Sequence, residues 1–256
     1  MRCFESSTWW RRPETGGRYT PLWSVGTPKP LGQLAQQVGP YKAKNLDIAH
    51  EIVDAPSVAD GLESAADTHH ADLLVVGSRG LTGLKQALLG SAAQRALRTV
   101  QTHVMVARGE APAASGYKRI LIPTDFSLPA ENAIRLALAL AAPDAQFELA
   151  HFWRVPETTR ADEYSELVID TVAASVKERG GKLLESFLQD APNATFSSIQ
   201  ASPERGIGEK LESDDYDLVV IGSYGRSNLR RWLLGSVAEH TARIAPCAVA
   251  VAKPDS

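Results

Sequence analysis

The chain has 256 residues, and its 27 basic and 30 acidic side chains leave a formal net charge of −3. A hydrophobic fraction of 44% excludes a wholly disordered chain. The near-neutral charge argues against general attraction to nucleic acid or to an anionic membrane. The longest apolar runs are far shorter than the roughly 18 to 20 residues of a membrane span. The two cysteines match no metal or redox spacing, so we expect a reducing, cytoplasmic location.

An internal repeat divides the chain. Residues 72–107 recur as residues 217–252, at an offset of 145 positions, and 16 of the 36 aligned positions are identical. This offset is the length of a domain rather than that of a solenoid repeat. We therefore expect two related domains, residues 31–108 and residues 117–254, joined by a linker over residues 109–116.

The first copy begins irregularly. Residues 1–30 are rich in Trp, Pro and Gly and show no helix or strand pattern, so we expect this segment to be disordered. Pro30–Gly39 suits the tail of a long helix, and Ile48–Val53 suits a strand. The repeat places the counterpart of the first strand before the chain begins. We therefore expect the first copy to lack strand 1 and strand 2, and we hypothesise that its start is truncated or frame-shifted.

The second copy alternates strands with helices over its whole length. Short apolar runs predict strands at 117–122, 147–153, 195–200, 217–221 and 248–252. Helical stretches are predicted at 128–142, 161–189, 206–212 and 236–245, the last ended by Pro246. This alternation, with strands that are apolar on both faces, is typical of an α/β fold with a parallel sheet covered by helices on each side.

A glycine motif, Gly-x2-Gly-x9-Gly-Ser, follows one strand in each copy. It comprises Gly77, Gly80, Gly90 and Ser91 in the first copy and Gly222, Gly225, Gly235 and Ser236 in the second. Glycine lets a strand turn sharply and approach a ligand, and the Gly-Ser pair opens a helix whose free N–H groups favour a phosphate. The alternative is purely structural: the glycines form tight turns, and each serine begins a capping box with Gln94 or Glu239.

These residues resemble the universal stress protein family. The resemblance rests on the glycine motif, on the opening segment Tyr117–Ser127 and on Leu233–Val237, and it covers residues 117–254 fully and about 45–108 in part. It implies a Rossmann-like, five-stranded parallel sheet of order 3-2-1-4-5 in each complete copy, with an ATP cleft.

The resemblance also implies pairing through the fifth strand. Within this chain, His103–Arg108 would then pair with Ala248–Lys253, and a homodimer is a further expectation.

The resemblance assigns an ATP site to the second copy. The implied contacts are Pro123, Thr124, Asp125, Phe152, Ile221, Gly222, Gly225, Gly235, Ser236 and Val237. Asp125 and Thr124 would meet the adenine and ribose, while the glycines and Ser236 would hold a triphosphate with Mg²⁺ bound through its oxygens. Phe152 stands where the family has a small aliphatic residue, which would narrow the adenine slot. The first copy keeps only a degenerate site at Gly77, Gly80, Gly90 and Ser91.

The function expected from these residues is binding rather than catalysis. We expect a regulatory protein of the stress response that responds to ATP, with slow hydrolysis as an open question. The alternative is an interaction module of the same fold without nucleotide. The same interpretation treats Arg226, Arg230 and Arg231 as a solvated loop face and His151 as a structural residue.

Overall fold

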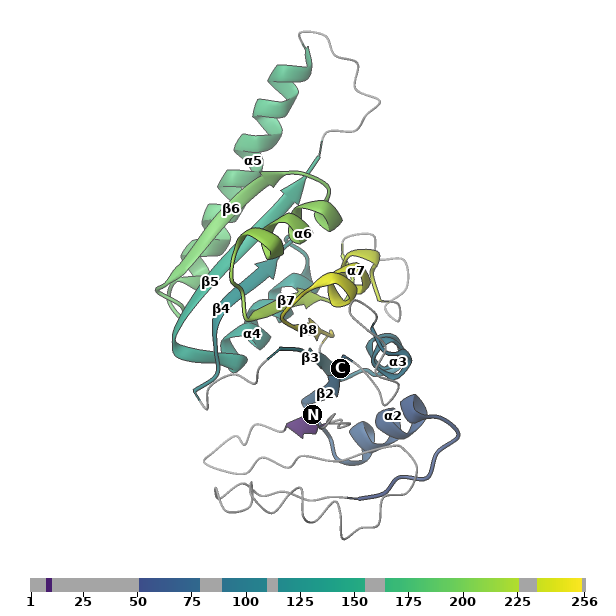
Figure 1. The fold of residues 1–256 in the computed structure, drawn as a ribbon. Coiled ribbons are helices and arrows are strands. Elements are labelled where there is room, and N and C mark those ends of the chain that lie inside the picture. Colours follow the sequence, from purple (N-terminus) through teal and green to yellow (C-terminus); the bar gives the residue numbers. More distant parts are fainter. Residues whose placement is uncertain are drawn as a thin grey trace. The chain divides into compact units, whose positions relative to one another are not determined.

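The computed structural model describes residues 8–10, 51–78, 89–109, 115–154, 164–225 and 234–254. The chain divides into two compact units, one made mainly of residues 1–108 and the other mainly of residues 109–255 (Figure 1). The expected helix tail at Pro30–Gly39 lies outside the described residues, as does most of the predicted linker.

The second unit contains a five-stranded parallel sheet. Its strands are β4 (Tyr117–Pro123), β5 (Ala141–Trp153), β6 (Ala194–Gln200), β7 (Leu218–Gly222) and β8 (Ala248–Ala252). They pair in the order β6-β5-β4-β7-β8, and every pair is parallel. Numbered within the repeat, this is the order 3-2-1-4-5, so the prediction is confirmed for the second copy.

Four helices cover this sheet: α4 (Leu128–Leu140), α5 (Tyr164–Phe187), α6 (Pro203–Ser213) and α7 (Ser236–Ile244). Figure 1 shows α6 and α7 on the near face and α4 and α5 on the far face, as right-handed crossovers require. The strands are therefore buried on both faces, and Ile120, Leu121 and Ile122 are all 0% exposed.

The starts of β5 and α6 differ from the sequence expectation by six and by three residues. Strand β5 begins at Ala141, directly after α4, rather than at Phe147. Helix α6 begins at Pro203 rather than at Gly206, because Ser202 is its N-cap and proline suits the first helical position.

The first unit has α2 (Val58–Thr68), β2 (Leu73–Gly77), α3 (Ser91–Thr99) and β3 (His103–Ala107). Strands β2 and β3 are parallel, as the repeat predicts. The strand expected at Ile48–Val53 is not formed by its described part, residues 51–53.

Strand β1 (Thr8–Trp10) departs from the expectation of a disordered start. It pairs antiparallel with β2, with Thr8 opposite Val75 and Trp10 opposite Leu73. In the second copy, the equivalent edge of β7 is occupied by the parallel strand β4. The strand order of the first copy therefore differs from that of the second. The physical reason is that an edge with unpaired N–H and C=O groups accepts another strand.

Candidate functional site

The candidate site lies at the carboxyl ends of two adjacent parallel strands, β4 and β7. After β4 the chain moves to β5 on one side, whereas β7 lies on the other side of β4. This reversal is the topological switch point at which open α/β sheets bind ligands. Pro123 is the last residue of β4 and Gly222 is the last residue of β7, so both predicted loops begin at this edge.

The loop after β4 presents Asp125 in a fixed turn. The backbone N–H of Ser127 donates to Asp125 Oδ1 at 3.1 Å, and the Ser127 hydroxyl donates to the same oxygen at 2.5 Å. Ser127 is also the N-cap residue of α4. One carboxylate oxygen therefore closes the turn, as Asp side chains commonly do.

The second oxygen of Asp125 faces the loop after β7. A Cβ atom added at Gly225 would lie 2.6 Å from Asp125 Oδ2, closer than real Cβ contacts allow. Glycine, which has no Cβ atom, lets the Asp125 carboxylate lie this close to the backbone of the β7 loop. The fold thus brings together two predicted site residues that are 100 positions apart in the sequence.

Gly222 and Phe152 have roles in packing. A Cβ atom at Gly222 would lie 2.8 Å from the backbone carbonyl of Pro129, so this glycine lets β7 pack against the first turn of α4. Phe152 is 7% exposed. Its ring packs on α6, where a Cβ atom at Gly206 would lie 2.3 Å from the ring. Gly206 therefore makes room for the aromatic ring. Ile221, another predicted site residue, is also buried, at 6% exposed.

The amino terminus of α7 lacks a side-chain cap. Its N-cap residue is Gly235, in an extended conformation, and no side chain in the described part of the chain caps the backbone N–H groups there. Ser236 is the first helical residue, so the expected capping box is wrong. The same holds for α3, where Gly90 is the N-cap and Ser91 begins the helix. Uncapped N–H groups and the helix dipole together favour an anion at this end of α7.

The two copies build the same turn after their fourth strand. In the first unit, Ser78 N donates to Ala107 O at 3.2 Å and Gly90 N donates to Ser78 O at 2.9 Å. In the second unit, the equivalent bonds are Ser223 N to Ala252 O at 2.9 Å and Gly235 N to Ser223 O at 2.7 Å. The duplication therefore extends from sequence to hydrogen bonding. Gly80 and the three loop arginines lie outside the described residues.

The sequence of each repeat matches a known protein family. The sequence model of the universal stress protein family matches residues 10–108 and residues 116–253. The chain belongs to the universal stress protein family. The two matches show the tandem form.

Curated relatives and solved structures agree with this membership. A universal stress protein of Methanocaldococcus jannaschii is 29% identical over 141 residues, which span 48% of this chain and 87% of the relative. One from Staphylococcus epidermidis is 31% identical over 146 residues, 54% of this chain and 86% of the relative. A protein of unknown function from Pseudomonas aeruginosa has a TM-score of 0.69 at 14% identity, over 93% of this chain and 82% of that chain.

A universal stress protein of Archaeoglobus fulgidus has a TM-score of 0.55 at 20% identity, over 88% of this chain and 78% of that chain. At such identities the structural likeness shows the fold alone.

Sequence reasoning missed Glu204 in this universal stress protein. Its Oε1 atom accepts from the Ser236 hydroxyl at 3.4 Å, across the first turns of α6 and α7. The two residues are 32 positions apart and share no motif. Only the packing of α6 beside α7 brings this carboxylate to the glycine motif, so no local sequence signal could have identified it. Among the described residues, no cluster of three or more side chains is suited to a metal ion.

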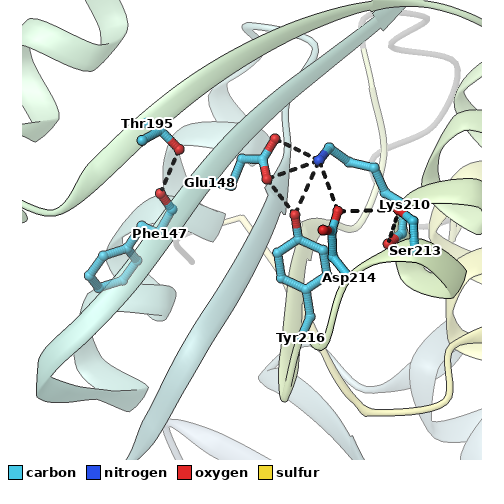
Figure 2. Close-up of polar contacts among 7 residues, drawn as sticks. All are labelled: Phe147, Glu148, Thr195, Lys210, Ser213, Asp214 and Tyr216. Carbon is cyan, nitrogen blue, oxygen red and sulfur yellow. Dashed lines mark hydrogen bonds and ion pairs between the residues drawn. The ribbon is translucent and has the colours of Figure 1, made fainter.

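A second polar cluster joins β5 to α6 (Figure 2). Lys210 Nζ contacts Glu148 Oε1 at 2.8 Å and Asp214 Oδ2 at 3.5 Å, and the Tyr216 hydroxyl donates to Glu148 Oε2. Burial acts to raise the pKa of Glu148, but hydrogen bonds from Lys210 and Tyr216 outweigh it and lower that pKa. Burial and the Glu148 carboxylate raise the pKa of Tyr216 to about 12. The members of this cluster bind one another, which marks it as structural.

Proposed function

We propose that the second repeat binds Mg-ATP at the carboxyl ends of β4 and β7. The observation that carries the proposal is the close approach of the Asp125 carboxylate to Gly225, in the loop after β7. The uncapped start of α7 belongs to the same glycine motif and supplies N–H groups suited to phosphates. Binding would shift the population of conformations that a partner protein recognises, so the protein would act as a nucleotide-dependent regulator of the stress response.

Each part of the nucleotide has candidate residues. Thr124 and Asp125 would hold the adenine and ribose, and Gly235, Ser236 and Val237 would hold the phosphates through backbone N–H groups and one hydroxyl. Mg²⁺ would neutralise phosphate charge and would be held mainly by phosphate oxygens. Glu204, whose carboxylate contacts Ser236, is an acidic candidate for holding that ion. We propose binding rather than turnover, because the glycine motif itself (Gly222, Gly225, Gly235 and Ser236) places no histidine or glutamate beside the phosphates.

Titration calorimetry with Mg-ATP tests the proposal on Asp125→Asn. Asparagine keeps an oxygen that can close the Ser127 turn, so the loop is preserved while the charge is lost. We expect binding to weaken by about tenfold or more, equivalent to about 1.4 kcal/mol. Asp144→Asn is the control, because it removes the same charge from an exposed carboxylate elsewhere in this unit. Equal affinity of Asp125→Asn and wild type would reject the site.

The alternative is an interaction module without nucleotide. It is favoured by the packing of Gly222 on Pro129 and by the turn that Asp125 closes, since both residues then have folding roles that need no ligand. Thermal unfolding with and without Mg-ATP separates the two functions. Ligand that binds only the native state raises the melting temperature, so an unchanged melting temperature at millimolar Mg-ATP would support the alternative.

A further inference from the structure

His151 lies one residue before Phe152 on β5 and contacts the Asp125 loop. It is 8% exposed, and its Nδ1 atom lies 2.6 Å from the carbonyl oxygen of Thr124. A carbonyl oxygen can only accept, so Nδ1 must carry the hydrogen. This bond holds the peptide group that immediately precedes Asp125.

The same imidazole ring also holds the residue that follows Asp125. The ring centroids of Phe126 and His151 are 4.6 Å apart. The backbone of Phe126 has a φ of 61°, in the left-handed region that side-chain-bearing residues rarely adopt. Such a conformation persists only where the surroundings enforce it, and strain of this kind gathers at functional sites.

Other contacts secure this strained residue. Phe126 N donates to Thr124 Oγ1 at 3.1 Å. The Arg179 guanidinium lies 5.8 Å from the centre of the Phe126 ring, and the Phe196 ring lies 6.3 Å away. His151 differs from these neighbours because it contacts the residues on both sides of Asp125.

We propose that His151 is a positioning residue that fixes the Asp125 carboxylate for nucleotide binding. This inference rests on the proposed function and deepens it. The hydrogen bond from Nδ1 fixes the peptide before Asp125, and the ring contact fixes the turn after it. A loop that is already ordered loses less conformational entropy when a ligand binds. Nucleotide binding therefore requires the hydrogen-bond donor at Nδ1, and a side chain that only fills the volume of the ring is not enough.

The experiment compares His151→Leu with His151→Asn. Leucine fills a similar volume but cannot donate, whereas the asparagine amide nitrogen can take the place of Nδ1. We expect His151→Leu to weaken Mg-ATP binding by about tenfold and His151→Asn to stay within about threefold of wild type. Both variants lose the ring contact, so their melting temperatures should fall together. Affinities that follow the melting temperatures instead of the donor would overturn the proposal.

A matched control and a double variant complete the design. Phe147→Leu changes an equally buried residue of β5 whose ring contacts Phe187, so it should lower the melting temperature without changing affinity. In the Asp125→Asn background, His151→Leu should cost little further affinity, because a positioning residue acts through its target. Full additivity would contradict the inference. If wild type does not bind Mg-ATP, the proposed function fails first.

NMR of ¹⁵N-labelled histidine tests the contact without ATP. We expect the Nδ1–H tautomer at His151, with its proton protected from exchange. Observation of the Nε2–H tautomer would overturn the inference even if Mg-ATP binds and Asp125→Asn weakens that binding, so the two failures are distinguishable.

Discussion

At the scale of single residues, two adjacent glycines of α5 have opposite surroundings. A Cβ atom at Gly180 would lie 2.1 Å from the Phe196 ring, whereas one at Gly181 would have nothing within 4 Å. We expect Gly180→Ala to lower the free energy of unfolding by about 1–3 kcal/mol through overpacking. We expect Gly181→Ala to raise it by about 0.5–1 kcal/mol, because glycine is a poor helix former.

Urea denaturation of both variants checks this prediction. The gain in helix propensity is the same at the two positions, so the difference between them isolates the contact with Phe196. Equal unfolding free energies would show that the ring moves aside without cost.

Single residues also show what the sequence could predict. The repeat and the glycine spacing identify Asp125, Gly225 and Ser236 as candidates. The approach of Gly225 to Asp125 and the contact of Glu204 with Ser236 depend on how strands and helices pack, and no local pattern encodes them. The capping box was wrong because the extended residue before α7 is Gly235, one position earlier than the serine.

At the scale of elements, the polar cluster of Glu148, Lys210, Asp214 and Tyr216 joins β5 to α6 (Figure 2). Hydrogen bonds to ionised groups contribute about 1.5–3 kcal/mol, so we expect Glu148→Gln to destabilise the fold by that order at neutral pH. The folded-state pKa of Glu148 lies below its ordinary value of 4.5. Its ionised form therefore stabilises the fold above that value, and this contribution is lost as the pH falls through the folded pKa.

Urea unfolding of wild type and Glu148→Gln over a range of pH tests this dependence. The difference in unfolding free energy should be largest near neutrality and should shrink as the pH falls below about 4. Glu178→Gln is the control, because Glu178 forms an exposed ion pair with Lys182 on α5 and should have little effect. A difference that does not change with pH would mean that the Glu148 charge is not what stabilises the cluster.

Most elements of the second copy were predictable because each strand is a short apolar run between turn signals. Their order required the family resemblance. Strand β1 was not predictable, because Thr8–Trp10 favours strand by residue type but is too short to show an alternating pattern, and it pairs only where β2 offers an edge.

At the scale of the whole molecule, the two repeats share one turn but differ in what surrounds it. Both contain the hydrogen bonds that follow Gly77 and Gly222. In the second unit, β7 pairs on one edge with β4, and the loop after β4 carries Asp125. In the first unit, β2 pairs with β3 on one edge and with the short antiparallel strand β1 on the other. The pairing of His103–Arg108 with Ala248–Lys253 stays a prediction.

This asymmetry predicts one nucleotide per chain. Phosphate-binding N–H groups alone give little affinity for ATP, because they leave the adenine and ribose without contacts, so the first repeat should not bind at micromolar concentrations. Calorimetry should give one Mg-ATP per chain, and Ser236→Ala should weaken binding while the repeat-equivalent Ser91→Ala leaves it unchanged. Two nucleotides per chain, or equal effects of the two serine variants, would show that the first repeat completes its site in another way.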